Sequence, residues 1–96
     1  MTQISGRISI SEKALMVDLE NEAVILNLNN ERYYGLDDVS KNFWHWLNEF
    51  KDVDQVLHHA VDAYQVEEEV IRKDLGGFLL ELSKAGLISF DGEQTS

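Results

Sequence analysis

The stretch that most constrains the fold runs from Leu26 to Leu47, LNLNNERYYGLDDVSKNFWHWL, and holds both tryptophans and two of the three tyrosines. It reads as an apolar strand, a turn, an aromatic strand and an amphipathic helix. Asn29 and Asn30 tolerate the positive φ angles that hairpin turns require. A chain of 96 residues without cysteine has no disulfide or thiolate-bound metal to stabilise it, so its core must form around this stretch.

Antiparallel strands are predicted in the first half of the chain. Glu22 to Leu28 alternates between two sets of side chains and is the clearest strand, and Arg32 to Leu36 returns as its partner. Arg7 to Ile10 predicts an edge strand, and Ala14 to Leu19 predicts another strand or a continuation of the first. Together they predict a three-stranded antiparallel sheet within residues 7–36.

The faces of the hairpin are only partly determined. One set of side chains on the first strand is Val24, Leu26 and Leu28, the other is Ala23, Ile25 and Asn27, and at least one set should be buried. A loop of two residues, or of three with a bulge, decides whether Tyr33 or Tyr34 points into the core, since a shift of one residue exchanges the faces. The sequence leaves this open.

Apolar residues at helical spacing predict three helices, over residues 38–50, 53–64 and 67–85. Asp37 or Asp38 is a suitable N-cap for the first helix, and Asp52 with Gln55 forms a capping box for the second. The buried arc of the first helix is expected to contain Val39, Phe43, Trp46, Leu47 and Phe50, with Trp44 at its border.

The third helix carries more apolar surface than one core face needs. Its main apolar arc is Ile71, Leu75, Phe78, Leu79 and Leu82. A second strip lies off that arc, flanked by Lys73 and Lys84, and consists of Val70, Gly77 and Leu80. Because glycine in a helix interior costs about 1 kcal/mol relative to alanine, the Gly76-Gly77 pair indicates that something approaches this helix closely.

After Gly86 the segment LISF predicts a short strand, and the polar tail from Asp91 is expected to be disordered. The chain is therefore expected to be a single domain, ordered over about residues 7–90. Strands followed by helices predict an α+β fold in which a small antiparallel sheet packs on a helical layer.

The charge balance limits the partners of such a domain. Eighteen acidic residues against eight basic ones give a net charge of −10, which repels nucleic acid and anionic membranes and favours a peptide or protein partner. The sequence has no apolar run long enough to span a bilayer and no signal peptide pattern, so a cytoplasmic protein is expected.

Sequence motifs for catalysis or metal binding are missing. The three histidines, His45, His58 and His59, lack the i, i+4 spacing that lets two imidazoles share a metal ion. No phosphate-binding glycine loop or nucleophile motif occurs, because the Gly76-Gly77 pair lies inside a helical pattern without GK[ST] beside it. We therefore expect no enzymatic activity, cofactor or metal.

Several fragments together resemble the PqqD-type family, the recognition elements that bind leader peptides of ribosomally made, modified peptides. The apolar strand at residues 24–28 is followed by RYYGL at 32–36, FWHWL at 43–47, Asp74-Leu75 with Phe78-Leu79 and Leu82, and Gly86-Leu87-Ile88. The resemblance covers residues 14–90 and is greater to the stand-alone proteins of lasso-peptide pathways than to the form serving pyrroloquinoline quinone synthesis. Glu31 departs from the pattern, since many members have glycine there.

The resemblance implies a winged helix-turn-helix scaffold that performs no chemistry. It implies that the leader of a precursor peptide adds as a strand to the aromatic strand, beside the third helix, and is presented to a separate protease or modifying enzyme. The peptide-binding residues expected on this basis are Arg32, Tyr33, Tyr34, Gly35, Leu36, Lys73, Asp74, Leu75, Gly77 and Phe78. Among them, Lys73 and Arg32 are expected to hold acidic leader residues. Leu75 and Phe78 either line an apolar pocket or belong to the core.

A winged-helix DNA-binding regulator is the main alternative, because a shared fold does not fix function. Its recognition helix should present arginine and lysine to DNA. The third helix instead carries a local net charge of −2, from Arg72, Lys73 and Lys84 against Glu67, Glu68, Glu69, Asp74 and Glu81. A structural subunit, or an adaptor for another peptide, is a further alternative.

Overall fold

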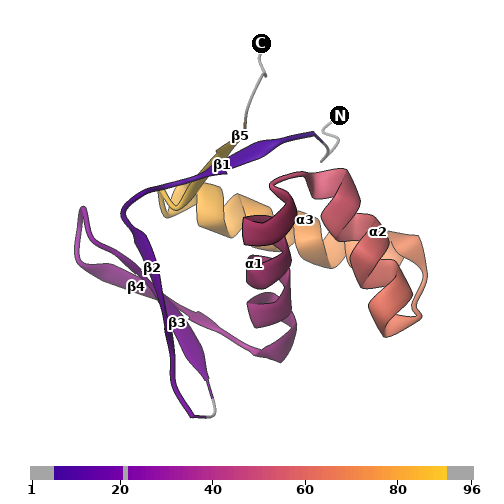
Figure 1. Cartoon of the computed structure of the whole chain (residues 1–96), viewed down its shortest axis with the longest axis horizontal. Helices are drawn as coiled ribbons and strands as arrows, with labels where there is room; N and C mark the ends of the chain where they lie inside the picture. Colours follow the sequence, from indigo (N-terminus) through magenta and orange to yellow (C-terminus); the bar gives the residue numbers. More distant parts are fainter. Residues whose placement is uncertain (1–5, 21, 91–96) are drawn as a thin grey trace.

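The computed structural model describes residues 6–20 and 22–90. Its elements are β1 (Ile8–Ile10), β2 (Ala14–Asp18), β3 (Ala23–Asn27), β4 (Arg32–Leu36), α1 (Asp38–Phe50), α2 (Val53–Tyr64), α3 (Glu68–Lys84) and β5 (Ile88–Phe90). Figure 1 shows β2, β3 and β4 on one side of the three helices, and β1 beside β5 near the chain ends. The tail expected to be disordered lies outside the described residues.

The main sheet has the antiparallel order β2-β3-β4 and is followed by three helices, which confirms the predicted fold class. Its central strand pairs on both sides, so that Ile25 lies opposite Met16 on β2 and opposite Tyr34 on β4. The edge strand predicted near residues 7–10 forms, but it pairs with β5 in a separate two-stranded sheet. There the buried Ile8 and Ile88 close one end of the core.

The inner face of β3 is formed by Ala23, Ile25 and Asn27, all at most 5% exposed. The other set points away from the helices: Val24 and Leu26 are half-buried, and Leu28 is 54% exposed. Ala23 is small, which lets the helices approach the sheet. The polar side chain of Asn27 can be buried because it forms hydrogen bonds. The set with the larger apolar side chains is therefore the outer one.

Four residues, 28–31, separate the paired positions Asn27 and Arg32. Positive φ was expected at Asn29 and Asn30, but in this loop it occurs at Glu31, with a φ of 61°. The amide of Glu31 donates to Asn27 O at 2.8 Å, and Asn30 Oδ1 accepts from the Arg32 amide at 3.0 Å. Asn30 therefore contributes to the turn through its side-chain hydrogen bond and not through a positive φ angle.

Replacing Glu31 by glycine should raise the free energy of unfolding by about 1 kcal/mol, because the left-handed conformation is unfavourable for a residue with a Cβ atom. Urea denaturation measures the change. Asn29→Gly is the matched control in the same loop and should give no gain, since φ at Asn29 is not positive. Equal effects of the two substitutions would contradict this account of the turn.

The helix starts follow the predicted caps. Asp37 Oδ1 accepts from the Ser40 amide at 2.8 Å, and Asp52 Oδ1 accepts from the Gln55 amide at 3.2 Å. The buried arc of α1 is different from the expected one, because Trp44 is 4% exposed whereas Val39 is 39% exposed. The helix packs against both β4 and α2, which turns its buried side toward Phe43, Trp44 and Leu47 and leaves Val39 near the surface.

Candidate functional site

The outer edge of β4 has no partner strand among the described residues. Leu28 N donates to Lys13 O at 2.9 Å, so the even-numbered residues of this strand direct their backbone groups toward β2 and the odd-numbered ones toward β4. In an antiparallel pair, alternate residues point their backbone groups to opposite sides. Arg32, Tyr34 and Leu36 therefore face β3, and Tyr33 and Gly35 present N–H and C=O groups to the open edge.

Two adjoining hollows lie between β4 and α3. The first, here called the Arg32 hollow, has a volume of about 420 Å³ and is lined by Ile25, Asn27, Asn30, Arg32, Tyr33, Tyr34, Glu81, Lys84, Ala85 and Leu87. The second, the Phe78 hollow, has a volume of about 610 Å³ and is lined by Tyr34, Asp37, Val39, Ser40, Phe43, Lys73, Asp74, Gly77, Phe78 and Glu81. Tyr34 and Glu81 line both, so the hollows form one groove along β4.

An aromatic cluster forms the floor of the groove at its Phe78 end. The Phe78 ring is centred 6.2 Å from the Tyr34 ring and 6.0 Å from the Phe43 ring, and Phe78 is only 6% exposed. Gly77 is exposed next to it, and no atom lies within 4 Å of the position that a Cβ atom would take there. The helix therefore offers bare backbone beside an apolar floor.

Seven of the ten expected peptide-binding residues line the groove: Arg32, Tyr33, Tyr34, Lys73, Asp74, Gly77 and Phe78. Gly35 and Leu36 instead line a shallow hollow at the far end of β4. Leu75 is 1% exposed and packs in the core, where it does not reach the groove surface. Tyr33 is the outward tyrosine, 74% exposed, and Tyr34 is the half-buried one on the inner face.

Sequence reasoning did not assign several groove residues to peptide binding: Ile25, Asn27, Asn30, Asp37, Val39, Ser40, Phe43, Glu81, Lys84, Ala85 and Leu87. For two of them a signal existed. Lys73, Gly77, Glu81 and Lys84 recur at intervals of three or four residues and so share one face of α3. Extending this face to the C-terminal end of α3 identifies Glu81 and Lys84. The other residues come from elements that only the tertiary fold brings together.

Asn27 fixes the end of the groove where α3 finishes. Its side chain is 5% exposed; Nδ2 donates to Ala85 O at 2.8 Å, and Oδ1 accepts from the Asn29 amide at 2.9 Å. One amide thus joins the strand, the hairpin turn and the end of the helix. Buried polar groups of this kind must be satisfied, which makes the spacing between β3 and α3 specific at this point.

Burial raises the pKa of the Tyr34 phenol above its usual value of 10.0, and the carboxylates of Glu81 and then Asp37 raise it further. A group whose pKa is raised by folding stabilises the folded state fully below its unfolded pKa. That contribution is lost as pH rises through the folded pKa.

Tyr34→Phe should therefore make the free energy of unfolding fall less steeply with pH above about 10. Chemical denaturation at pH 9, 10 and 11 measures the slope. A wild-type slope in Tyr34→Phe would contradict the assignment of the raised pKa to Tyr34.

Gly77→Ala should stabilise the free protein by up to about 1 kcal/mol, because alanine is the better helix former and its methyl group meets no neighbour. The same methyl group narrows the groove, so any ligand that runs close to α3 should bind less tightly. Thermal denaturation and a binding titration measure the two effects. Gly35→Ala is the control, because Gly35 lies in a strand and its replacement does not change helix propensity. It should leave the free energy of unfolding nearly unchanged. Higher stability with unchanged binding would show that nothing passes close to Gly77.

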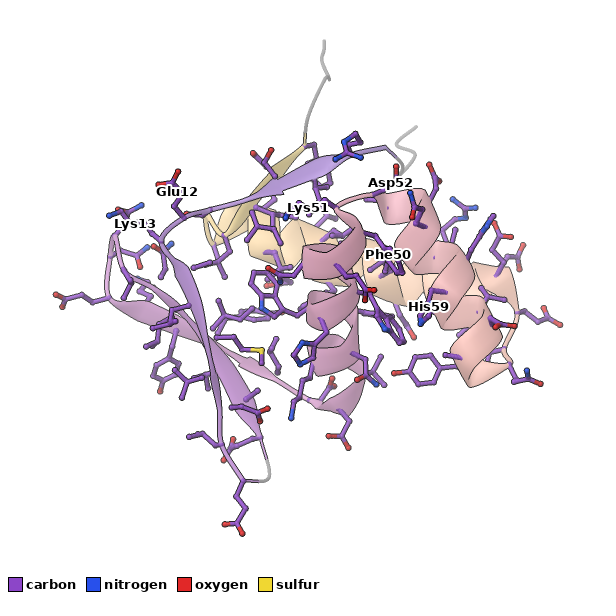
Figure 2. The ribbon with its side chains drawn as sticks, in the orientation of Figure 1. Glu12, Lys13, Phe50, Lys51, Asp52 and His59 are labelled. Carbon is purple, nitrogen blue, oxygen red and sulfur yellow. The ribbon has the colours of Figure 1, made fainter. Side chains whose placement is uncertain are left out.

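A further hollow of about 610 Å³ lies away from the groove and is lined by Phe50, Gln55, His58, His59, Val61, Asp62 and Glu68. Figure 2 shows Phe50 and His59 close together on α1 and α2, with ring centroids 5.5 Å apart. The His59 ring is also centred 4.7 Å from the Trp46 ring, so this histidine is packed edge-on against aromatic neighbours. Within residues 6–20 and 22–90, no group of three or more metal-ligating side chains occurs. No described helix is long and apolar enough to cross a membrane.

Comparison with known proteins identifies both the family and the fold. Residues 22–88 match the family model described as coenzyme PQQ synthesis protein D (PqqD). None of the curated protein sequences is significantly similar. The structure of TbiB1 in complex with the TbiA(beta) leader peptide superposes with a TM-score of 0.77 at 28% identity, covering 90% of this chain and 98% of TbiB1.

A second solved structure has the same fold at lower identity. Lasso peptide synthetase B1 complexed with the leader peptide superposes with a TM-score of 0.76 at 16% identity, covering 86% of this chain and 98% of the other. The family match spans β3, β4, all three helices and the start of β5, and so contains the whole groove between β4 and α3. The chain therefore belongs to the PqqD family, as a PqqD-type RiPP recognition element in sequence and fold.

Proposed function

We propose that this protein binds the leader segment of a ribosomally synthesised precursor peptide as an additional strand on β4. The observation that carries the proposal is the open edge of Tyr33 and Gly35, which borders a groove with an apolar floor. An extended peptide gains affinity from main-chain hydrogen bonds to such an edge and specificity from pockets beside it. The similar structures of TbiB1 and lasso peptide synthetase B1 are complexes with leader peptides, which supports this choice of ligand.

The leader is then delivered to a separate processing enzyme, the leader protease of a lasso-peptide pathway, in the cytoplasm. In this proposal the protein itself is not a catalyst and carries no cofactor. Its contribution is to hold an otherwise flexible segment in one extended conformation. That reduces the entropy lost when the enzyme captures its substrate.

Titration with a fluorescent leader peptide tests the binding step. The probe is the leader segment of a short precursor peptide sought beside the gene for this chain, and a scrambled peptide of equal composition is the control. Saturable binding of the leader alone is the expected result. No binding of the leader, together with binding to DNA from the upstream region, would favour the regulator instead.

The outer face of the sheet supports a second protein partner. Leu15, Leu26 and Tyr33 lie directly opposite one another across the three strands, on the side away from the helices. Leu15 is 49% exposed, and Leu19 and Leu28 extend the same face with exposures of 46% and 54%. Contiguous apolar surface on a small protein commonly marks an interaction site. This face adjoins the β4 edge, so an enzyme bound there would lie next to a captured leader.

Leu15→Asp tests the delivery step. It places a charge on the outer face without touching the groove, so cleavage of the precursor by the leader protease should slow about tenfold or more while leader affinity stays unchanged. Val66→Asp is the control, because Val66 is also an exposed apolar residue, at 39%, but precedes α3. Equal cleavage rates for both variants would mean that the enzyme docks elsewhere.

A further inference from the structure

The two halves of the groove carry opposite charge. In the Arg32 hollow, the guanidinium of Arg32 and the ammonium of Lys84 outnumber the carboxylate of Glu81. In the Phe78 hollow, the carboxylates of Asp37, Asp74 and Glu81 outnumber the ammonium of Lys73. A chain with a net charge of −10 thus gathers two of its eight basic residues at one end of this groove. The general acidity of the surface does not explain that placement.

None of these charged side chains forms an ion pair within the described part of the chain. The two ion pairs in the described part of the chain are Lys41 with Asp18 and Arg72 with Glu68, and neither lies in the groove. Asp37 caps α1 through Oδ1. Arg32, Lys84, Lys73, Asp74 and Glu81 are all exposed. Their charges are therefore available to a ligand.

Tyr34 lies where the basic and the acidic ends of the groove meet. It lines both hollows, and its ring packs on Phe78. Burial raises the pKa of its phenol, and the carboxylates of Glu81 and Asp37 raise it further, as expected beside the acidic Phe78 end. The apolar floor there, formed by Phe43, Phe78 and Val39, suits the stem of a long side chain whose charged tip reaches the carboxylates.

We propose that the groove selects leader segments with a defined charge order: an acidic side chain in the Arg32 hollow and a lysine or arginine in the Phe78 hollow. This rests on the proposed function and specifies its ligand. Both side chains must leave the peptide on the side facing α3, so an even number of positions separates them. Lys73 was expected to hold an acidic leader residue, but its carboxylate neighbours favour a basic one.

A display library of random twelve-residue peptides tests the proposal without knowledge of the natural leader. Peptides selected on the wild-type protein should be enriched in pairs of one acidic and one basic residue at an even separation. On Arg32→Glu/Lys84→Glu, the acidic position should change to a basic one. Arg7→Glu/Lys13→Glu reverses the same two charges outside the groove and should select the wild-type pattern.

A selected peptide then provides a quantitative test. Reversing its acidic residue to lysine should weaken binding to the wild-type protein about tenfold, and the Arg32→Glu/Lys84→Glu variant should recover most of that loss. Peptides that need the open β4 edge, shown by loss of binding in Gly35→Pro, but have no charge pattern would overturn the charge-order proposal and leave strand addition standing. If no selected peptide needs that edge, strand addition and the charge order are both overturned.

Discussion

Replacing Gly35 by proline is expected to weaken leader binding about thirtyfold while the sheet stays folded. The Gly35 amide faces the open edge of β4, so proline removes a donor that an added leader strand would use but none that β3 uses. The proline ring also occupies the space of the incoming strand. Loss of one hydrogen bond together with that steric conflict amounts to about 2 kcal/mol, which corresponds to the expected change in affinity.

Gly35→Ala is the matched control. No atom lies within 4 Å of a Cβ atom at Gly35, and alanine keeps the amide, so this variant should bind the leader almost as well as the wild-type protein. Circular dichroism checks that both variants fold, and the fluorescent titration gives the affinities. Wild-type affinity in Gly35→Pro would mean that the leader does not pair with β4.

Replacing Phe78 by alanine should lower both stability and leader affinity. Phe78 is 6% exposed and packs against Tyr34 and Phe43, so truncation should cost about 3–5 kcal/mol of the free energy of unfolding. It also removes the apolar floor of one hollow, and leader affinity should fall at least about tenfold, or about 1.4 kcal/mol. Denaturation and titration below the melting temperature measure the two quantities.

Leu79→Ala separates these two effects. Leu79 is the next residue of α3, fully buried and outside the groove, so its truncation should also destabilise the protein but leave the affinity of the folded fraction unchanged. Phe78→Leu, which keeps most of the apolar volume, should fold well and still bind the leader less tightly. Equal affinities for Phe78→Leu, Leu79→Ala and the wild-type protein would show that Phe78 is only a core residue.

Local chemistry made most of the fold predictable from sequence. Asp37 and Asp52 cap the helices where the sequence predicts, because N-capping depends on the next three residues alone. The separate pairing of β1 with β5 was not predicted, since it joins segments from opposite ends of the chain. The positive φ at Glu31 was missed because glutamate rarely adopts it, although the glycine that many family members have at this position was a signal for it.

The groove was predictable in part. RYYGL identified the edge strand through the family resemblance and its place just before the helices, and Gly77 marked the helix face because glycine is unfavourable in a helix interior. Val39 could not be assigned to the groove, since its exposure depends on how α1 turns between β4 and α2. The role of Asn27 was equally hidden, because its partner Ala85 O is 58 positions away in the chain.

Amide hydrogen exchange of β4, with and without the leader peptide, tests strand addition most directly. In the free protein the amides of Tyr33 and Gly35 face solvent and should exchange fast, whereas the Tyr34 amide is already directed at β3. On saturation with the leader, Tyr33 and Gly35 should both become about a hundredfold slower or more, with little change at Tyr34. Leader binding that leaves both amides in fast exchange would contradict strand addition at β4.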